Sequence, residues 1–198
     1  MSAQPAKELK PQQIVGHFIN GVDVEDRNRP APIMNPATGK ISRHVGMAST
    51  QTVGEAIAAA EAAFPGWRDT LPIKRARIMF RFKQLLEENA NEIAGAITNE
   101  HGKDLNGALG EFNRGVEGVE YACGISELLK GEHSMNTGPG IDSWSAHQPL
   151  GVVAGITPFN FPAMVPMWMY PMAIACGNTF VLKPSEKDPT ASMMCARL

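Results

Sequence analysis

The spacing of apolar and polar residues divides the chain into a β-rich start, a run of helices and a strand–helix–strand end. Within a polar lead-in that covers residues 1 to about 30, short apolar runs flank Asn20-Gly21, a two-residue turn signal. We therefore expect a hairpin over residues 17–22. A second turn is expected at residues 35–39, where Asn-Pro-Ala-Thr-Gly lies between apolar runs. Both segments predict edge hairpins.

Apolar residues then follow helical spacing from Thr52 onward. Thr52 and Glu55 form a capping-box pair, and Pro65-Gly66 is expected to end this first helix. A second helix is expected to begin at Pro72, with arginines and lysines on its outer face. The residues predicted to form its inward face are Ile73, Arg77, Phe80 or Ile78, Phe82, Leu85 and Leu86.

Two further helices are predicted before residue 130. One covers about residues 91–101, with Ile93 and Ile97 inward and Gly102 as its C-terminal stop. The other covers residues 104–130 and contains glycines that weaken a helix, which predicts close packing against a neighbouring element. These glycines are Gly107, Gly110, Gly115 and Gly118.

The last third of the chain has the pattern of a βαβ crossover. Residues 134–149 are loop-like and then extended, and residues 152–156 form a short apolar run typical of a buried strand. An apolar, proline-containing helix is predicted over residues 161–176, followed by a second buried strand at residues 179–182. A strand, helix and strand in this order predict parallel strands and therefore an α/β fold.

Composition and charge exclude several classes of function. The 198 residues suffice for one large domain or two small ones, and 43% of them are apolar. The net charge of −2 argues against nucleic acid as a partner, which needs a basic face. No apolar run is long enough for a membrane span, and the N-terminus has no apolar signal core. The three cysteines fit no disulfide framework or metal spacing, which indicates a reducing cytoplasm.

Ligand-binding and catalytic residues are expected at the carboxyl ends of the two predicted strands, where α/β sheets bind their ligands. The first strand continues into residues 157–162, Thr-Pro-Phe-Asn-Phe-Pro, and the second into residues 183–189, Lys-Pro-Ser-Glu-Lys-Asp-Pro. No Gly-x-Gly-x-x-Gly fingerprint follows the first strand, so an ordinary dinucleotide-binding Rossmann site is not predicted.

These two loops, with the segment Ala-Cys-Gly-Asn-Thr-Phe-Val-Leu-Lys-Pro-Ser-Glu at residues 175–186, resemble the aldehyde dehydrogenase superfamily. The resemblance extends to residues 35–39 and to Asn-Glu-His-Gly-Lys at residues 99–103, so it covers nearly the whole chain. Phe159 and the methionine-rich residues 163–171 are most similar to the CoA-acylating methylmalonate-semialdehyde dehydrogenases.

The resemblance implies the N-terminal part of the aldehyde dehydrogenase fold: helices plus the first βαβ unit of an incomplete Rossmann-like parallel sheet. Residues 1–133 would supply the hairpins and helices of the cofactor-binding domain, and residues 134–150 an extended segment of the oligomerisation type. Residues 151–198 would be the first βαβ unit of the NAD-binding domain, truncated, and the catalytic domain would be absent.

Asn160 is similar to the amide that donates into the oxyanion hole of the thiohemiacetal intermediate in this family. A neutral amide suits this role because it stabilises developing negative charge without titrating. The residues alone allow another interpretation, in which Asn160 caps the helix that follows it.

The resemblance also implies an NAD site. Lys183 would hydrogen-bond the adenosine ribose and Glu186 would accept from the ribose hydroxyls, and a carboxylate there favours NAD over NADP. Thr157, through its backbone, and Phe159 would line the nicotinamide side, while Lys187 would support the adenosine end. The alternative for the three charged residues is an ordinary solvated turn.

Arg114 lies where relatives of the methylmalonate-semialdehyde type have an arginine that binds the substrate carboxylate. The guanidinium can donate two parallel hydrogen bonds to a carboxylate. The alternative is a surface arginine that pairs with Glu111 or Glu117.

Other reactive residue types have weaker signals. Cys123 and Cys176 are expected to be core thiols, and Cys195 matches no nucleophile motif. The histidines show no metal-ligand spacing, so no metal site is predicted. Trp144 and Trp168 are expected to be core or interface residues.

The family reaction also needs a nucleophilic cysteine and a general base. The chain contains neither a Gly-Gln-x-Cys nor a Glu-Leu-Gly-Gly segment, and it stops within an apolar helix opening at residues 190–198, as if cut. The sequence therefore predicts an N-terminal fragment of an NAD-dependent, CoA-acylating malonate- or methylmalonate-semialdehyde dehydrogenase, inactive alone. The intact enzyme would use NAD as cofactor and CoA as co-substrate, release CO2 and form acetyl-CoA or propanoyl-CoA.

The resemblance further implies a cytoplasmic homo-oligomer, a dimer or tetramer when intact, that takes part in valine or inositol catabolism. Its partner would be a small semialdehyde, with no nucleic acid and no membrane. Two alternatives stay open. The chain is part of a non-acylating NAD-dependent aldehyde dehydrogenase, or it is a non-catalytic fragment that assembles with full-length subunits.

Overall fold

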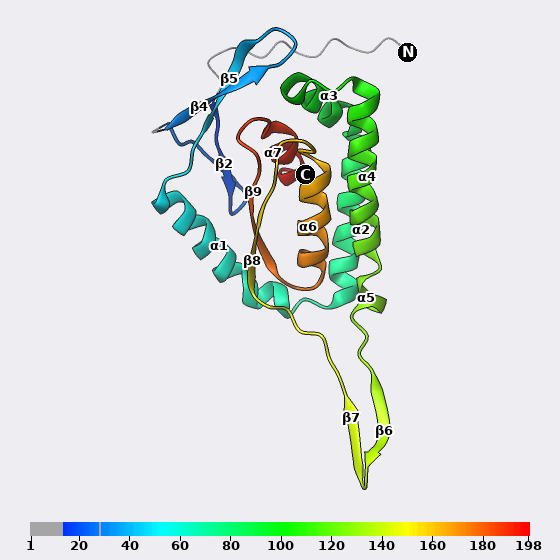
Figure 1. Ribbon diagram of the computed structural model, residues 1–198. Helices are drawn as coiled ribbons and strands as arrows, with labels where there is room; N and C mark the ends of the chain where they lie inside the picture. The colour runs from blue at the N-terminus through cyan, green and yellow to red at the C-terminus, as the bar shows by residue number, and fades with distance from the viewer. Residues whose placement is uncertain (1–13, 28) are drawn as a thin grey trace.

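The computed structural model describes residues 14–27 and 29–198, so much of the predicted polar lead-in lies outside the described residues. Helices cover both sides of a two-stranded parallel sheet, and short β-strands close one end (Figure 1). The strands are β1 (Ile14–Val15), β2 (His17–Ile19), β3 (Val22–Val24), β4 (Pro30–Asn35), β5 (Lys40–Gly46), β6 (His133–Gly138), β7 (Ile141–Trp144), β8 (Val152–Ile156) and β9 (Thr179–Lys183). The helices are α1 (Thr50–Arg68), α2 (Pro72–Glu88), α3 (Ala90–His101), α4 (Leu105–Cys123), α5 (Ile125–Leu128), α6 (Met164–Ala175) and α7 (Thr190–Ala196).

Both N-terminal hairpins are confirmed. Strands β2 and β3 pair antiparallel, and the turn between them uses positive φ at Asn20 (51°) and Gly21 (77°). Strands β4 and β5 pair antiparallel around the predicted turn, and β5 also pairs parallel with β1. Asn35 forms an Asx turn, in which its side-chain Oδ1 accepts a hydrogen bond from the Ala37 N–H at 2.9 Å.

Helix α1 begins earlier and ends later than predicted. Its N-cap is Ser49, whose hydroxyl accepts from the Thr52 N–H at 3.0 Å, so Thr52 is not the capping residue. Pro65 lies inside the helix, which continues to Arg68. The extra turn is anchored because the indole N–H of Trp67 donates to the Ile174 carbonyl at 2.8 Å. The predicted apolar face is not buried, because every residue of α1 is at least partly exposed.

Helix α2 begins at Pro72 as predicted. Leu86 is buried and Phe82 packs against the core, as predicted, but in the first half of the helix the buried side differs from the prediction. Its buried residues are Arg75, Ala76, Met79 and Leu86, while Ile73, Ile78 and Phe80 are exposed. Arg75 is buried because its guanidinium donates to the Ala175 carbonyl at 2.8 Å and to the carbonyls of Arg68 and Thr70. Burial lowers the pKa of Arg75.

The third and fourth predicted helices have different outcomes. Helix α3 is confirmed, with Ile93 and Ile97 buried and Gly102 in the left-handed region at φ 89°. The predicted helix over residues 104–130 is wrong in its length. It ends at Cys123, and α5 continues after a break at Gly124, where the helical hydrogen-bond ladder is interrupted.

Two of the four glycines on α4 allow close contact with α6, as predicted. A Cβ at Gly115 would lie 2.3 Å from the Met167 Cε and 3.1 Å from the Met164 Cα, and one at Gly118 would lie 2.9 Å from the Met167 carbonyl oxygen. Gly110, in contrast, faces open space, and Gly107 contacts only its own N-cap residue, Asp104.

The βαβ unit is confirmed in its topology. Strands β8 and β9 pair parallel, with Ile156 opposite Lys183, and α6 connects them. Helix α6 begins at Met164, later than predicted, because residues 157–163 form a loop. The strands are less buried than predicted, and Ile156 is 78% exposed. The reason is that β8 and β9 form a sheet of only two strands in the described part of the chain.

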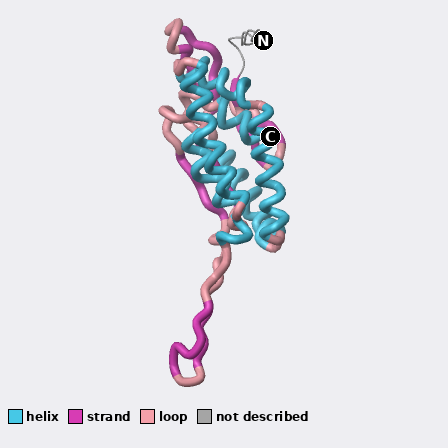
Figure 2. Tube along the Cα trace, turned by 90° about the vertical axis from the view of Figure 1, so that its right-hand side faces the viewer, coloured by secondary structure: helices cyan, strands magenta, loops and turns pink. Residues whose placement is uncertain are grey.

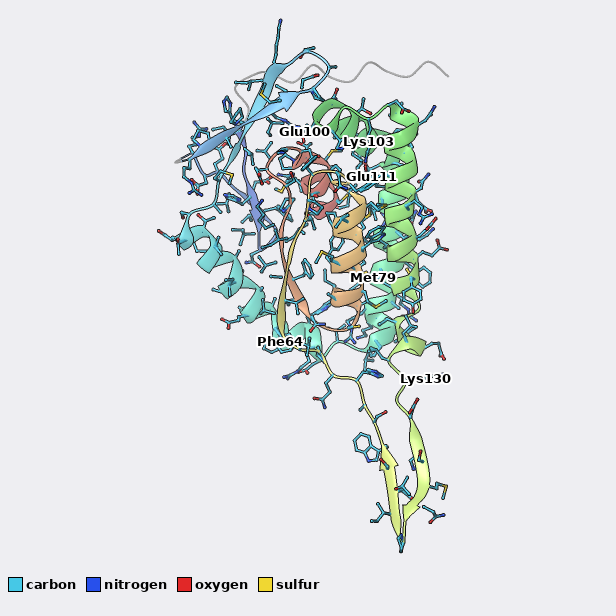
Figure 3. The ribbon with its side chains drawn as sticks, viewed as in Figure 1. Phe64, Met79, Glu100, Lys103, Glu111 and Lys130 are labelled. Atoms are coloured by element: carbon cyan, nitrogen blue, oxygen red, sulfur yellow. The ribbon has the colours of Figure 1, made fainter. Side chains whose placement is uncertain are left out.

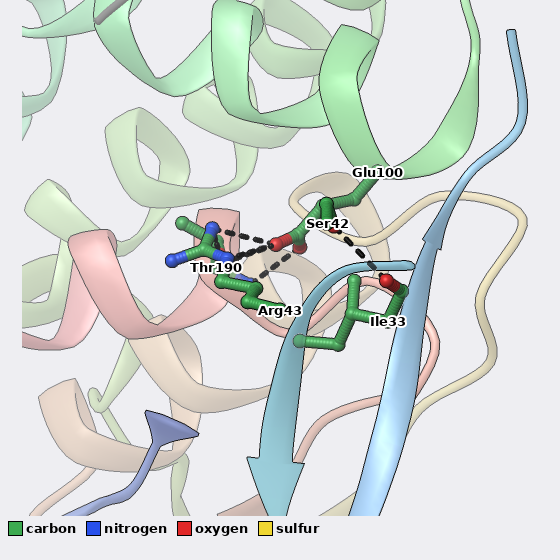
Figure 4. A network of polar contacts seen from close by, with 5 residues as sticks. All are labelled: Ile33, Ser42, Arg43, Glu100 and Thr190. Carbon is green, nitrogen blue, oxygen red and sulfur yellow. Dashed lines mark hydrogen bonds and ion pairs between the residues drawn. The ribbon is translucent and has the colours of Figure 1, made fainter. Parts of the chain in front are cut away.

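A buried ion pair joins the β-rich end to the last helix (Figure 4). Glu100 on α3 accepts from the Arg43 guanidinium at 2.6 Å, and both side chains are nearly excluded from water. Glu100 also accepts from the backbone N–H of Thr190 at 3.0 Å and from its hydroxyl at 2.6 Å. One carboxylate thus ties β5, α3 and the start of α7 together.

Strands β6 and β7 form an antiparallel hairpin that projects away from the helices (Figures 1 and 2). This accounts for the predicted extended segment. Its apolar side chains, Met135, Ile141 and Trp144, are all exposed. No helix in the described residues combines the length and apolar character of a membrane span.

We expect Gly118→Ala to lower the free energy of unfolding of the chain by about 1–2 kcal/mol, because the added methyl group meets the Met167 backbone carbonyl, which cannot rotate away. The matched control is Gly110→Ala on the same helix, which should raise stability by about 0.5–1 kcal/mol because its Cβ meets nothing. Urea unfolding curves measure both changes. Equal effects of the two variants would contradict the close packing of α4 on α6.

Candidate functional site

The two loops that follow β8 and β9 lie side by side at one edge of the parallel sheet. We call residues 157–162 the first crest loop and residues 184–189 the second crest loop. The Thr157 N–H donates to the Lys183 carbonyl at 3.2 Å, which extends the pairing of the strands into the loops. Lys187 of the second loop places its ammonium 4.1 Å from the centre of the Phe159 ring of the first. The predicted cofactor residues are therefore brought together.

Lys183 and Glu186 form an ion pair at the end of β9. The Lys183 Nζ lies 2.6 Å from the Glu186 Oε2, and the two side chains are 50% and 43% exposed. The hydrogen bond from Lys183 is the main cause that lowers the pKa of Glu186, followed by a backbone hydrogen bond. Glu186 is therefore an ionised hydrogen-bond acceptor at neutral pH.

Asn160 lies in the first crest loop with its side chain exposed. Its backbone carbonyl accepts from the Lys103 ammonium at 2.8 Å. Its carboxamide has no hydrogen-bond partner among the described residues, and it does not cap α6, because Ala163 is the N-cap residue. The amide is thus available to a ligand, and its role as an oxyanion donor stays a prediction.

Glu111 caps α6 in place of Asn160. Its Oε1 accepts from the N–H groups of Ala163 at 3.0 Å and Met164 at 3.3 Å, while its Oε2 binds the Lys103 ammonium. Lys103 also lies over the Phe161 ring, 4.0 Å from its centre. Figure 3 shows Lys103 and Glu111 close together beside the start of α6. The pair thus binds the first crest loop from α4 and from the turn after α3.

Sequence reasoning missed the part that Lys103 and Glu111 play. A signal was present, because Glu111 lies on the same face of α4 as the buried residues Ala108, Phe112 and Gly115. A carboxylate within an apolar stripe must find a partner when the stripe is buried. The identity of that partner does not follow from α4 alone, because the loop it binds lies some 50 residues further along the chain.

Asp188 is the most perturbed carboxyl group of the second crest loop. It is buried, its Oδ1 has no hydrogen-bond partner among the described residues, and hydrogen bonding to Ser185 lowers its pKa. Burial raises the pKa of Asp188 to about 7, and the negative charges of Glu100 and Glu111 add to the rise. The Lys103 ammonium opposes it.

Among the described residues, Arg114 forms no hydrogen bond or ion pair with either crest loop. It lies on the exposed side of α4 with its side chain 69% exposed, and its Nε is 3.7 Å from the Glu117 Oε2. This is the surface pair that the sequence offered as an alternative to substrate binding. Such exposed pairs contribute little free energy, about 0–1 kcal/mol, so the guanidinium remains available.

None of the three thiols has the environment of a nucleophile. Burial raises the pKa of Cys123 and of Cys176, and raises that of Cys195 to about 12. Cys123 and Cys195 are buried, and Cys176 is half-buried. A raised pKa removes the reactive thiolate at neutral pH. Among the described residues no group of three or more His, Cys, Asp and Glu side chains could hold a metal ion.

Comparisons with known proteins identify related sequences and structures. A model described as the aldehyde dehydrogenase family matches residues 23–198. The malonate-semialdehyde dehydrogenase of Pseudomonas aeruginosa is 59% identical over 92% of this chain, and the acylating, mitochondrial methylmalonate-semialdehyde dehydrogenase of Arabidopsis thaliana is 44% identical over all of it. The chain spans 37% and 33% of the length of these relatives.

A solved structure has the same fold over nearly the whole chain. It is a Sinorhizobium meliloti protein assigned as a methylmalonate-semialdehyde dehydrogenase, in complex with NAD. Its TM-score is 0.91 with 47% sequence identity, and the match covers 94% of this chain and 38% of that structure. The helices and small sheets seen here therefore correspond to the N-terminal part of that fold.

We expect the stability of the chain to depend on pH through Asp188. A carboxyl group whose pKa rises from 3.8 to about 7 on folding binds its proton more tightly in the folded state, so stability falls as pH increases through that range. Asp188→Asn should therefore stabilise the chain by about 1–2 kcal/mol more at pH 8.5 than at pH 5.5. The control Asp142→Asn, on the exposed strand β7, should act equally at both pH values. Urea unfolding at the two pH values tests this, and an equal effect of Asp188→Asn at both would refute it.

Proposed function

The chain belongs to the aldehyde dehydrogenase family, and from that premise we propose that it supplies part of the NAD site and one oxyanion donor of a CoA-acylating malonate- or methylmalonate-semialdehyde dehydrogenase. The observation that carries the proposal is the pairing of the crest loops, which brings the Asn160 loop beside the Lys183–Glu186 ion pair. The whole enzyme would oxidise the semialdehyde, release CO2 and pass the acyl group to CoA.

The residues at the end of β9 fit the adenosine half of NAD. Glu186, held ionised by Lys183, would accept hydrogen bonds from both ribose hydroxyls, and its negative charge would repel the 2′-phosphate of NADP. Lys183 would donate to the same ribose. Lys187 would support the adenosine end, and Thr157 and Phe159 would line the nicotinamide side. When bound, NAD supplies the hydride acceptor.

Asn160 and Arg114 would act on the substrate. The Asn160 carboxamide, exposed and without an internal partner among the described residues, would donate to the oxygen of the tetrahedral intermediate. Arg114 would exchange its weak surface pair with Glu117 for the carboxylate of the semialdehyde, because its planar fork can donate two parallel hydrogen bonds to that group.

The nucleophile would come from outside these 198 residues. All three thiols of the chain have a raised pKa, so we propose that the chain alone has no dehydrogenase activity. The free thiols suit a reducing compartment, and we propose the cytoplasm.

A second candidate function is assembly. The β6–β7 hairpin exposes Met135, Ile141 and Trp144, an apolar set on a projecting arm. We propose that this arm contacts a second subunit and makes the enzyme a dimer or tetramer. The same contact would let the 198 residues join full-length subunits if they occur as a separate chain.

The proposed function is tested on the native protein, purified through a tag added before residue 1. We expect a mass more than twice that of these 198 residues, and NADH formation from malonate or methylmalonate semialdehyde that requires CoA. NADH formation without CoA would indicate the non-acylating alternative. A mass equal to 198 residues, together with an untagged full-length subunit in the preparation, would favour assembly. A 198-residue product that forms NADH by itself would refute the proposal.

Residue roles are tested in a hybrid enzyme, in which these 198 residues replace the matching segment of the Pseudomonas aeruginosa relative. We expect Glu186→Gln to raise the ratio of NADP to NAD usage, in kcat/KM, by about 10-fold or more, because the carboxylate no longer repels the 2′-phosphate. Glu127→Gln is the matched control, since Glu127 forms a similar exposed ion pair with Lys130. An unchanged cofactor ratio in Glu186→Gln would contradict the placement of the ribose at Glu186.

A further inference from the structure

Lys103 is directed at the first crest loop by the turn that ends α3. Gly102 adopts a φ of 89°, and a Cβ there would lie 2.7 Å from the Pro36 Cγ, so this turn is both left-handed and tightly enclosed. The next residue, Lys103, leaves the helix axis and extends toward Asn160 and Phe161.

The Lys103 ammonium has three donors, and the structure gives it three contacts. It donates to the Asn160 carbonyl at 2.8 Å, binds the Glu111 carboxylate, and lies 4.0 Å from the centre of the Phe161 ring. Its side chain is only 19% exposed, and that of Glu111 is 1% exposed. A pair so deeply buried holds its geometry closely, because separating the charges would leave one of them without compensation.

Glu111 fixes the other end of the same segment. Its second oxygen accepts from the first two N–H groups at the start of α6, on Ala163 and Met164. The Pro162 carbonyl between these contacts accepts from the Ser192 hydroxyl at 2.7 Å. The backbone from Asn160 to Met164 is therefore held at both ends by side chains that bind one another, while the exposed Asn160 carboxamide has no hydrogen-bond partner in the described part of the chain.

We propose that Lys103 and Glu111 are positioning residues for oxyanion stabilisation. They hold the Asn160 backbone so that its carboxamide already points to the place where negative charge develops. The inference rests on the proposed function of Asn160. An amide donor lowers the barrier only if it needs no reorganisation when the charge appears, so loosening its backbone should reduce its contribution.

The test is a double-mutant cycle in the hybrid enzyme, with Lys103→Met and Asn160→Ala. We expect Asn160→Ala to lower kcat about 100-fold or more, and Lys103→Met to lower kcat about 10-fold with KM changed less than about 2-fold. In the Asn160→Ala background, Lys103→Met should lower kcat by less than about 2-fold, because the amide that it positions is gone.

Three controls separate positioning from folding. Lys103→Arg keeps the charge and the donor and should restore most of kcat. Lys130→Met removes an exposed lysine at the base of the β6–β7 hairpin, far from Lys103 (Figure 3), and should leave kcat unchanged. NAD affinity, measured by fluorescence quenching, should be the same in Lys103→Met as in the unsubstituted hybrid. If Lys103→Met does not fold, the neutral pair Lys103→Met with Glu111→Gln takes its place, since glutamine keeps an acceptor for α6.

The outcomes distinguish this inference from the proposed function. If Asn160→Ala leaves kcat unchanged, the oxyanion role of Asn160 fails and the inference falls with it. If Asn160→Ala costs about 100-fold while Lys103→Met costs nothing, or costs the same in both backgrounds, only the positioning role is overturned.

Discussion

The structure depends on two buried carboxylates that accept from the N–H groups at the starts of two helices. Glu111 holds the start of α6 and is paired with Lys103, and Glu100 holds the start of α7 and is paired with Arg43. Helices α6 and α7 follow the first and second crest loops in the chain. Each loop therefore begins at a strand of the β8–β9 sheet and ends at a helix start that a carboxylate caps. The first N–H groups of a helix have no partners within the helix, and a buried carboxylate needs hydrogen-bond donors. The helix starts and the carboxylates therefore satisfy each other.

In this arrangement the backbone of the site is fixed, while its functional side chains stay exposed. The backbone of both crest loops is fixed by buried contacts, and the groups with chemistry, the Asn160 amide and the Lys183–Glu186 pair, stay exposed. An enzyme that must bind a cofactor and stabilise charge gains from such a separation, because the donors are rigidly placed while their polar atoms stay free for ligands. The proposed role of the chain in a larger enzyme follows from this division.

The sequence predicted well wherever the controlling signal is local. The turn at Asn20, the helix stop at Gly102 and the parallel crossover that aligns the crest loops depend on neighbouring residues, and all are confirmed. It failed where the controlling partner is distant. Arg75 is buried because it binds a carbonyl 100 residues away, and the first half of α2 therefore buries a different side from the one predicted. For Glu111, the sequence showed only a charged residue on the apolar face of α4, and it did not indicate which residues the carboxylate would bind.

The contact between Arg43 and Thr190 joins residues 147 positions apart, and that between Glu100 and Thr190 joins residues 90 apart. Contacts within the helices and hairpins are local and can form early, whereas contacts of such long range cost more loop-closure entropy and are expected to form later. During synthesis on a ribosome, the helical part can pack while the second crest loop is still being made. Among these 198 residues, we therefore expect the second crest loop to take its shape only when α7 has docked against α3.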